Sequence, residues 1–373
     1  MKSLYIAFQL LDKSSGITNK IVAQYKGLVN NGLDVGFCHY ELIDGKWTFV
    51  ADDKPVYYLG SGFHAHLALY YMFNPAYKYI RDNHIEFIYI RYTQFATPFF
   101  VDFLRKVHDL GVKIFMEIPT WPYDTDYVHG TFLNRLQRWI ERKSRVFFKK
   151  YVDRVVTVQD FDEIMTIPTI KISNGIDIKS INLRKVKQHK GINLLGVAHL
   201  GDWHGYDRLI EGMGLYYKET SNPIEINFYI VGDNEKVYKQ YLTIAKNYGI
   251  ENRIHFEGIK GGEELNNYFD TADLAIGCLG NHRKGVKDAK PLKSIEYAAR
   301  GIPFIYSESN SDFDNRSFVV KFPQDDTPIS VDILLDFIEK NHFDPSEIRK
   351  SVTKTLSWDY QMSKITSELI LKK

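Results

Sequence analysis

The chain has 373 residues, of which 44% are apolar, and its 48 basic and 46 acidic side chains give a formal net charge of +2. One hydrophobic core stops growing at roughly 250–300 residues, so this length predicts two domains, and the balanced charge excludes a nucleic-acid protein that works through a global positive field. No stretch approaches the ~20 apolar residues of a membrane helix, and the first apolar run is too short for a signal peptide.

Short apolar strands alternate with helical segments along the first half of the chain. This pattern is typical of a mostly parallel sheet with helices on both faces. After the first strand comes a loop that contains Ser15 and Gly16, and Gly16 would let a ligand approach the backbone closely. The predicted strands and helix of this half are residues 4–10, a helix at 17–30, and strands at 34–39, 87–91, 113–117 and 154–158.

Residues 116–127 (MEIPTWPYDTDY) leave the end of one of these strands. Glu117, Thr120 and Asp124 cluster there among aromatic residues and prolines. Two interpretations remain open. The cluster either binds a ligand at this strand end, or it forms a rigid structural turn.

The helical segment at residues 132–151 is basic and amphipathic. Its cations recur at spacings of three and four, so they form one stripe, and apolar residues line the other side. The stripe consists of Arg135, Arg138, Arg142, Arg145 and Lys149. Such a helix docks on an anionic leaflet, where each basic side chain contributes roughly 1 kcal/mol, or it packs its apolar face on its own sheet.

The second half repeats the rhythm of the first. A charged, apolar-poor stretch at residues 179–190 is the predicted interdomain linker. A final amphipathic helix is predicted at residues 358–371. The strands of this half are predicted at residues 193–197, 226–231, 254–256, 274–278 and 304–306.

The segment DAKPLKSIEYAARGIPFI, residues 288–305, predicts a ligand site. Pro291 suits the first turn of a helix that Gly301 ends, and a buried strand follows. The free N–H groups near Leu292 and Lys293 would point along a dipole that favours negative charge, so a diphosphate fits there.

Two carboxylates, Asp288 and Glu296, stand eight positions apart in this segment. Glu296 lies one turn beyond Leu292 on the same helix face, where it could accept hydrogen bonds from a ribose. Asp288 precedes the helix and could reach the group on the far side of the diphosphate. The alternatives are a surface carboxylate for Glu296 and a helix-terminal charge for Asp288.

Residues 288–305 resemble the paired-acid signature of the retaining glycosyltransferases of family 4, which have the GT-B fold. The likeness continues, in family order, through ISNGIDI, YIVGDN, IHFEGIK and TADLAIG, at residues 172–178, 229–234, 254–260 and 271–277. It implies an α/β protein with two Rossmann-like, doubly wound domains that face a central cleft. We expect these domains at residues 1–178 and 191–355, with a C-terminal helix at 356–373 that returns to the first domain.

The resemblance also implies a retaining hexosyltransferase that needs no metal or cofactor and takes its sugar from a nucleotide-diphosphate donor. The acceptor would be a hydroxyl of a glycan, lipid-linked polysaccharide or oligosaccharide, with no nucleic acid as partner. The leaving phosphate would help to deprotonate this hydroxyl, so no protein nucleophile is assigned. The two cysteines, Cys38 and Cys278, lack metal-ligand spacing and fit a reducing cytoplasm. Peripheral contact with the inner face of the plasma membrane is a separate prediction, which follows from the basic stripe.

The resemblance assigns further donor contacts. Gly232 lies in the YIVGDN strand end, and Gly258 and Ile259 match a backbone position that contacts the base, although an ordinary tight turn is an equal alternative there. Ser15 and Gly16 would face the diphosphate and the acceptor. The cluster of Glu117, Thr120 and Asp124 would bind the acceptor or the transferred sugar, unless it is the structural turn.

The chain also departs from the family pattern. His199 and His204 replace an Arg and a Lys, Asp288 replaces Glu, and residues 116–127 contain no histidine. A neutral imidazole stabilises a diphosphate less than a fixed cation does. The missing charge could come from Arg283, Lys284, Lys287 or Lys293, unless the loop NHRKGVK is only solvated.

Two rival functions therefore stay open. One is another enzyme on the same architecture, such as a nucleotide-sugar epimerase or hydrolase. The other is an inactive pseudo-glycosyltransferase that serves as a binding or chaperone subunit.

Overall fold

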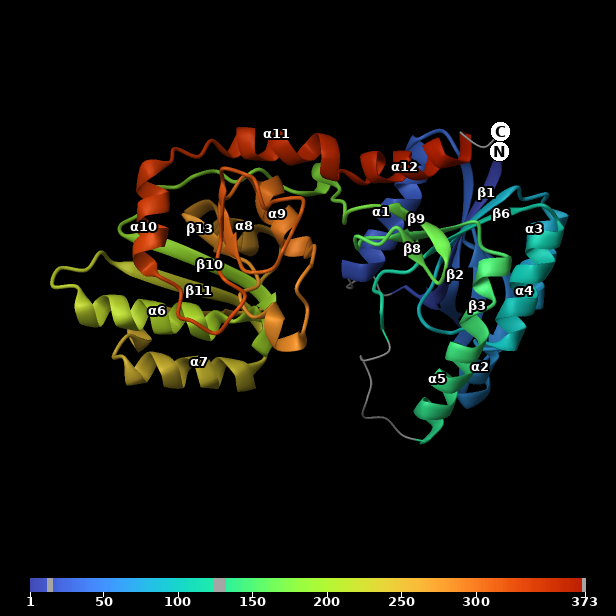
Figure 1. Cartoon of the computed structure of the whole chain (residues 1–373), viewed down its shortest axis with the longest axis horizontal. Helices are drawn as coiled ribbons and strands as arrows, with labels where there is room; N and C mark the ends of the chain where they lie inside the picture. The colour runs from blue at the N-terminus through green and yellow to red at the C-terminus, as the bar shows by residue number, and fades with distance from the viewer. Residues whose placement is uncertain (12–15, 124–131, 371–373) are drawn as a thin grey trace. The chain divides into compact units, whose positions relative to one another are not determined.

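The computed structural model describes residues 1–11, 16–123 and 132–370 (Figure 1). The chain divides into two compact units. The first unit contains Met1–Ser173 together with Trp358–Lys373, and the second contains Asn174–Ser357. Each unit is an α/β fold built on a sheet rich in parallel strands. None of the described helices is long and apolar enough to span a bilayer.

The first unit contains a nine-stranded sheet in the order β4-β3-β2-β1-β5-β6-β7-β9-β8. Six of its strands run parallel, whereas β3 and β4 form an antiparallel hairpin at one edge and β8 pairs antiparallel with β9 at the other. The strands are β1 Lys2–Leu10, β2 Asp34–Ile43, β3 Lys46–Ala51, β4 Lys54–Gly60, β5 Phe87–Arg91, β6 Lys113–Glu117, β7 Arg154–Thr157, β8 Glu163–Ile164 and β9 Ile167–Lys171.

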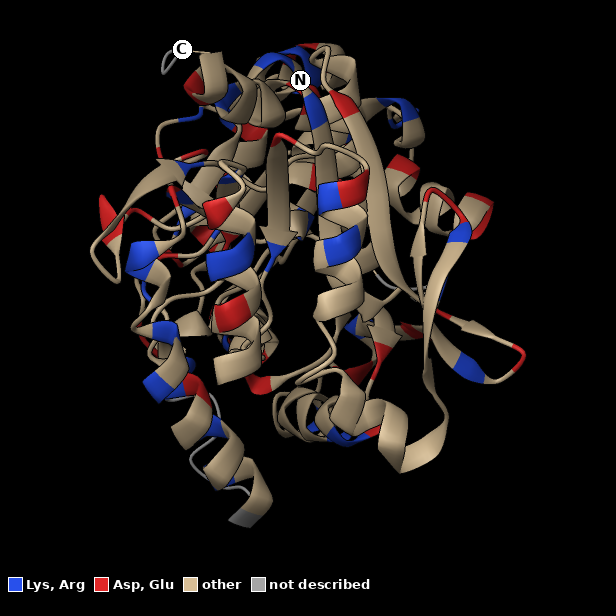
Figure 2. Ribbon diagram, turned by 90° about the vertical axis from the view of Figure 1, so that its right-hand side faces the viewer, with Lys and Arg blue, Asp and Glu red and all other residues tan. Residues whose placement is uncertain are grey.

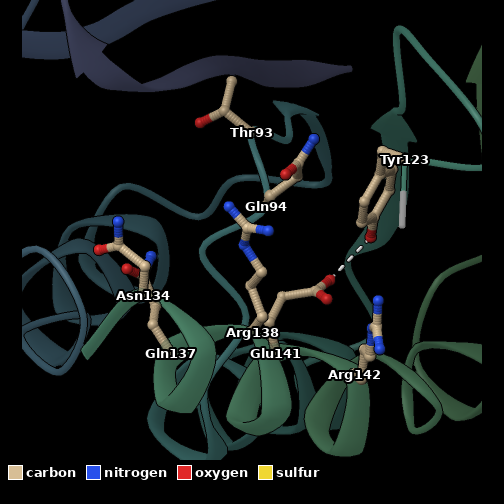
Figure 3. A pocket seen from close by; sticks show the side chains of 8 residues that line it. All are labelled: Thr93, Gln94, Tyr123, Asn134, Gln137, Arg138, Glu141 and Arg142. Atoms are coloured by element: carbon tan, nitrogen blue, oxygen red, sulfur yellow. Dashed lines mark hydrogen bonds between the residues drawn. The ribbon is translucent and has the colours of Figure 1, made fainter. Parts of the chain in front are cut away.

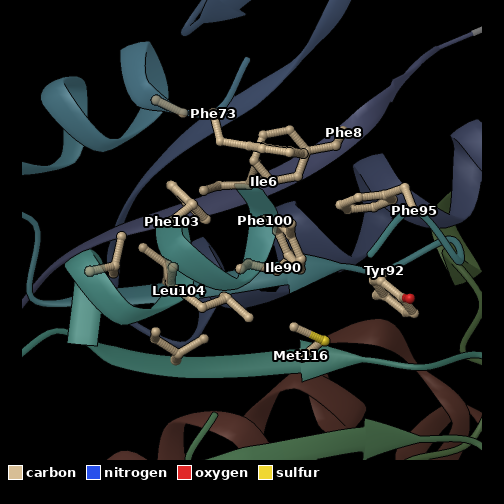
Figure 4. Close-up of a cluster of buried hydrophobic side chains, with 14 of the residues drawn as sticks. Ile6, Phe8, Phe73, Ile90, Tyr92, Phe95, Phe100, Phe103, Leu104 and Met116 are labelled. Atoms are coloured by element: carbon tan, nitrogen blue, oxygen red, sulfur yellow. The ribbon is translucent and has the colours of Figure 1, made fainter. Parts of the chain in front are cut away.

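Helices cover both faces of this sheet, which explains why β1 is apolar without interruption from Leu4 to Phe8. Alternate β1 side chains enter two different cores, with Ile6 and Phe8 in one and Tyr5 and Ala7 in the other. Figure 4 shows the first of these cores, where Phe8 lies among the aromatic rings of α4. The helices of the unit are α1 Gly16–Asn30, α2 Gly62–Ala68, α3 Asn74–Asp82, α4 Pro98–Asp109, α5 Phe132–Arg145 and α12 Trp358–Ile370.

The last helix, α12, packs on α1. A Cβ atom at Gly27 of α1 would lie 2.8 Å from Met362 Cγ and 2.9 Å from the Trp358 carbonyl oxygen, so only glycine fits at this contact. Gln361 also accepts a hydrogen bond of 2.8 Å from the backbone N–H of Ser173. The C-terminal helix is therefore part of the first unit.

The second unit contains a six-stranded parallel sheet in the order β12-β11-β10-β13-β14-β15. Its strands are β10 Ile192–His199, β11 Ile226–Asp233, β12 Ile254–Gly258, β13 Leu274–Ile276, β14 Phe304–Tyr306 and β15 Val319–Lys321. Its helices are α6 Tyr206–Glu219, α7 Glu235–Asn247, α8 Gly262–Thr271, α9 Leu292–Arg300, α10 Val331–Lys340 and α11 Pro345–Leu356. Counted within the unit, this is the 3-2-1-4-5-6 strand order of dinucleotide-binding folds, in which ligands bind beyond the carboxyl ends of the strands.

Several predicted elements differ from those observed. The hairpin of β3 and β4 was not predicted, because its Asp52–Asp53 turn interrupts an aromatic run and both aspartates take the left-handed conformation, with φ of 50° and 61°. Residues 179–190 are not a free linker. Arg184 is 9% exposed and its Nε donates to the Gly301 carbonyl at 3.1 Å, which holds this segment on the second unit. The unit boundary falls earlier, between Ser173 and Asn174.

Candidate functional site

The helix that the sequence predicted after Pro291 is α9, Leu292–Arg300, and Gly301 ends it with φ of 78°. No acidic side chain lies in its first turn. The positive end of the α9 dipole is therefore not neutralised by its own first turn, and its first N–H groups form a potential anion site.

Lys293 in this first turn has a buried ammonium group. Its Nζ atom has no hydrogen-bond partner among the described residues. Burial lowers the pKa of Lys293, an effect that the charges of Cys278 and Glu308 partly oppose. A buried ammonium without a partner is costly, so this position is arranged either for the neutral amine or for an anion that is bound there.

Glu308 follows β14 and is completely buried. One carboxylate oxygen accepts a hydrogen bond of 3.2 Å from Asn281 Nδ2, and the other, Oε1, has no partner among the described residues. Burial raises the pKa of Glu308 to about 7. The sequence reasoning missed this residue, although a glutamate directly behind a buried strand end was a signal that could have found it.

His204 lies in a single 3-10 turn, Asp202–His204, and is 5% exposed. Its Nδ1 accepts a hydrogen bond of 3.1 Å from the Gly201 N–H. Burial, and after it the charge of Lys293, lower the pKa of His204 to about 3. The imidazole is therefore neutral in the free protein, so the basic group at this site is the amino group of Lys293.

The other replaced position, His199, is the last residue of β10 and is largely exposed. Its Nδ1 contacts a carboxylate oxygen of Asp233 at the end of β11. Gly232 has a structural role here, because a Cβ atom at its position would lie 1.6 Å from the Ala198 carbonyl oxygen. Only glycine lets β10 and β11 run this close together.

The paired acids differ in their surroundings. Glu296 is 32% exposed at its side chain and accepts a hydrogen bond of 2.9 Å from Arg300 Nε, one turn further along α9. Asp288 is exposed, and its segment runs parallel to Ser309, which follows β14. Asp288 and Glu308 thus belong to two adjoining segments.

The loop before α9 provides fewer available cations than predicted. Arg283 donates to Asp207 at 2.7 and 2.9 Å and to Asp326 at 2.7 Å, so two carboxylates already compensate its charge. Lys284 lies over the Trp203 ring. Lys287 is exposed.

Two predicted contacts to the base lie where β12 ends. Gly258 has φ of 71° and no atom within 4 Å of the position of a Cβ, so the space beside it is open. Ile259 is 76% exposed. Leu292 is also exposed, at 41%. These residues could contact a ligand with little rearrangement.

In the first unit, Glu117 does not face an open site. It is completely buried, its Oε1 lies 3.2 Å from Lys20 Nζ and 2.8 Å from Arg91 Nη1, and Tyr89 donates to its Oε2 at 3.1 Å. Burial alone would raise the pKa of Glu117, but Arg91 and Lys20 lower it to about 2. Glu117 is therefore the centre of a structural ion cluster and not an acceptor contact.

The other acceptor-side predictions have mixed outcomes. Gly16 begins α1 with open space at its Cβ position, and Thr120 is exposed. Ser15 and Asp124 lie outside the described residues.

A cavity of about 270 Å³ lies at the carboxyl ends of β5 and β6 in the first unit (Figure 3). Two of its residues follow β5, one follows β6, and the rest belong to α5. The lining consists of Thr93, Gln94, Tyr123, Asn134, Gln137, Arg138, Glu141 and Arg142. This is the edge of a doubly wound sheet at which ligands bind.

The basic stripe of α5 does not form one exposed surface as predicted. Arg138 and Arg142 line the cavity, and Arg145 is 9% exposed and bonded to Glu141 at 3.2 Å. The buried carboxylate of Glu141 lies on this same side of the helix, which therefore faces the interior of the unit. Figure 2 shows blue segments on several turns of α5, the helix at the lower left that adjoins a grey trace.

The outer face of α5 is instead apolar and exposed. Leu133, Leu136 and Trp139 are 69%, 43% and 59% exposed. Arg135 and Lys143 are exposed on the same helix, as is Lys149 just beyond it. The only acid of α5, Glu141, is buried, so the exposed charges of this helix are all positive.

Comparison with known proteins shows which families and solved structures this chain resembles. Residues 178–312 match the family "Glycosyl transferases group 1". Protein CapJ from Staphylococcus aureus is 28% identical over 171 residues, which make up 45% of this chain and 38% of CapJ, so the likeness spans well under half of that relative. Residues 296–372 also match the insulinase family of peptidases, but they contain a single histidine, His342, and lack the H-x-x-E-H arrangement of a zinc peptidase.

Three solved structures share the fold over the whole chain. A glycosyltransferase from Rickettsia africae has a TM-score of 0.67 at 13% identity, with 100% of this chain and 99% of that chain covered. Anabaena HepE in complex with UDP has a TM-score of 0.63 at 13% identity, with both chains fully covered at 100%. The lipopolysaccharide outer core galactosyltransferase WaaB has a TM-score of 0.60 at 12% identity, again with 100% of both chains covered. The chain therefore has the GT-B fold, and its residues 178–312 are similar to the group 1 glycosyltransferases.

Proposed function

We propose that this protein is a retaining glycosyltransferase that moves a sugar from a nucleotide-diphosphate donor to a hydroxyl of a lipid-linked glycan. The observation that carries the donor half of this proposal is the buried ammonium of Lys293 at the entrance to α9, which lies over the Tyr206 ring and has no hydrogen-bond partner among the described residues. Two solved structures with this fold add support, since HepE was determined in complex with UDP and WaaB is a lipopolysaccharide galactosyltransferase.

The donor's diphosphate would bind at the first turn of α9. Backbone N–H groups, the helix dipole and Lys293 would then act together on the same phosphate oxygens. These interactions are stronger in a dry site than in water, and they stabilise the charge that develops on the leaving diphosphate. Lys293 thus takes over the charge that His199 and His204 do not provide.

The neighbouring residues would position the rest of the donor. The Gly201 N–H occupies Nδ1 of His204, which leaves Nε2–H of the neutral ring to donate to a phosphate or sugar oxygen. Glu296 would accept from the ribose, for which Arg300 holds its side chain in place. Gly258 and Ile259 would contact the base, and Asp288 and Lys287 the sugar side.

Retention would follow a front-face course. The incoming hydroxyl approaches the anomeric carbon from the side on which the diphosphate departs, and a phosphate oxygen accepts its proton. The bond from the anomeric carbon to the diphosphate breaks as the new glycosidic bond forms. No protein nucleophile takes part, and the protein's contribution is to position the two substrates and stabilise charge.

Calorimetry with UDP, GDP, ADP and CMP tests the donor site. We expect one diphosphate to bind, and Lys293→Met to weaken its binding at least tenfold, which corresponds to about 1.4 kcal/mol. Lys246→Met, which changes an exposed lysine of α7, is the matched control. Binding of no nucleotide would favour the inactive binding subunit. Release of free or epimerised sugar from a nucleotide sugar without acceptor would favour the hydrolase or epimerase.

The exposed apolar face of α5 supports a second part of this proposal, which is docking on an anionic membrane. Leu133, Leu136 and Trp139 would enter the interface between headgroups and acyl chains, and Arg135 and Lys143 would meet the phosphates. The absence of an exposed acid on α5 matches an anionic surface. A protein held in this way would find a lipid-linked acceptor in the plane of the membrane, on the cytoplasmic side.

A further inference from the structure

The short helix α2 exposes its large apolar side chains and buries its small ones. Ala65 and Ala68 are buried, whereas Phe63 and Leu67 are 70% and 45% exposed. A surface helix normally does the opposite, because burial of the larger side chains removes more apolar area from water. The two exposed residues are four positions apart, so they lie on the same face of the helix and form an apolar ridge.

The ridge continues into a pair of exposed aromatic rings. Tyr71, whose N–H donates to the Ala68 carbonyl just beyond α2, is 48% exposed. Phe99, at the start of α4, is 60% exposed, and the two ring centroids lie 6.2 Å apart in an edge-on arrangement. We call Phe63, Leu67, Tyr71 and Phe99 together the aromatic surface. Large apolar side chains that gather in this way mark an interaction site, whereas single exposed ones do not.

The aromatic surface adjoins α5. Gln137 of α5 donates a hydrogen bond of 2.7 Å to the hydroxyl of Tyr70, the residue before Tyr71. The Tyr70 carbonyl oxygen accepts a hydrogen bond of 2.6 Å from Thr97, the residue that caps α4 two positions before Phe99. These contacts hold the end of α2, the start of α4 and α5 together, at the lower end of the first unit in Figure 1. The aromatic surface and the exposed apolar face of α5 are therefore neighbours on one unit.

The charge around the aromatic surface suits an anionic partner. Residues 61–81 contain no acidic side chain. On α4, Asp102 is paired with two cations of its own helix, each at 2.8 Å. The turn that joins β2 and β3, which lies near α2 where the Trp47 ring contacts that helix, carries one charge of each sign, Asp44 and Lys46. Each of these acids is thus matched by a cation.

A second copy of the chain fits this surface less well than a membrane does. In a symmetric dimer the surface would meet itself. Arg135 and Lys143, which are exposed on the adjoining α5, would then approach the same cations of the other copy. At a bilayer they would instead meet lipid phosphates, and aromatic rings are favoured at headgroup depth.

We propose that the aromatic surface is a second membrane contact, so that the first unit docks on an anionic bilayer through α2 and α4 as well as through α5. The inference rests on the proposed function, since it adds an attachment to the docking of α5. One attached helix leaves the unit free to roll about the helix axis, whereas two attachments fix its orientation. Two linked contacts also bind more tightly than either contact alone.

Sedimentation of the full chain with vesicles of phosphatidylglycerol and phosphatidylcholine tests this contact. We expect the combined change Phe63→Ser and Phe99→Ser to weaken vesicle affinity at least tenfold, because both side chains would lose apolar burial in the membrane interface. Leu110→Ser, at an exposed apolar position beyond the other end of α4, is the matched control and should bind like the unmodified protein.

A fluorescent label reports the same contact if the serine variants do not fold. The two natural cysteines, Cys38 and Cys278, are buried, so an environment-sensitive label on Leu67→Cys would attach to the single exposed thiol. Its emission should shift to the blue when vesicles are added. The same label on Leu110→Cys should show no shift.

Three outcomes separate this inference from the rest of the proposed function. Unchanged affinity in the double serine variant, together with weaker binding of Trp139→Ser, would overturn the inference and leave the docking of α5 intact. A blue shift at Leu67→Cys without vesicles, together with a dimer in analytical ultracentrifugation, would also overturn it, since a second copy would then cover the surface. UDP affinity in solution should be equal in all these variants, so the donor site is decided separately.

Discussion

Each unit of this protein buries a glutamate and a lysine near the carboxyl end of a parallel strand, but among the described residues only the pair in the first unit forms a direct ion pair. In the first unit, Glu117 contacts both Lys20 and Arg91. In the second unit, Lys293 Nζ and Glu308 Oε1 have no hydrogen-bond partners among the residues that the structure describes. Buried charges are costly unless they are paired, so the first cluster has a structural role, whereas we propose that a ligand completes the second.

The largest expected effect separates the two clusters by stability. Glu117→Gln leaves Lys20 and Arg91 buried without a counter-charge, so the free energy of unfolding should fall by about 3–5 kcal/mol in urea denaturation followed by circular dichroism. Lys293→Met removes a buried cation that has no hydrogen-bond partner among the described residues, and it should leave the stability of the ligand-free protein unchanged or higher. Glu251→Gln, at an exposed position, is the control. A loss of several kcal/mol in Lys293→Met would show that this lysine already has a structural partner.

The pH dependence of the two glutamates should have opposite signs. The raised pKa of Glu308, about 7 against an ordinary 4.5, means that its stabilisation is complete below pH 4.5 and is lost as the pH rises through 7. Glu308→Gln should therefore remove a decline of about 2–3 kcal/mol between pH 4.5 and 8. The lowered pKa of Glu117, about 2, gives stabilisation that is present above pH 4.5 and lost as the pH falls toward 2.

Urea denaturation of the unmodified protein and of Glu308→Gln at pH 5 and pH 8 measures the Glu308 effect. Identical pH dependence of the two proteins would mean that the Glu308 carboxyl is as well solvated as an exposed one. The contrast between the clusters would then disappear.

A smaller effect tests the same reasoning on α5. The inner face of this helix carries the Glu141–Arg145 ion pair, whereas its outer face carries exposed apolar side chains. Trp139→Ser should weaken the affinity for phosphatidylglycerol vesicles, measured by sedimentation, about tenfold. An apolar side chain that becomes largely buried in the membrane interface contributes about 1.5–3 kcal/mol to binding. Ile333→Ser, which changes an apolar residue 49% exposed on α10 of the second unit, should have no effect. Equal binding of the unmodified protein to phosphatidylcholine vesicles would remove the anionic-membrane proposal.

Much of the fold could be predicted because parallel, fully covered strands are continuous apolar runs. The strands at 87–91, 113–117 and 304–306 agree residue for residue with β5, β6 and β14. The helix after Pro291 could also be predicted, since Pro291 and Gly301 mark its ends. The edge hairpin of β3 and β4 could not, because half-covered antiparallel strands carry a weaker pattern.

The pairing of charges could not be read from the sequence. Lys20, Arg91 and Glu117 lie far apart along the chain, and only the sheet brings them together, which is why Glu117 was interpreted as an acceptor contact. The periodicity of α5 identified two faces but not the one that points inward. That choice depends on Glu141, whose partners Tyr92 and Tyr123 come from other segments.

The most direct test of the central claim is calorimetry of UDP binding at pH 8 in buffers of different ionisation enthalpy. The claim is that Lys293 needs an anion as its partner. Because burial lowers the pKa of Lys293 in the free protein and a diphosphate would raise it, binding should take up protons, and affinity should fall as the pH rises through the lowered pKa. Lys293→Met should abolish both effects. Proton uptake that is unchanged in Lys293→Met, or UDP affinity equal in the two proteins, would contradict the account.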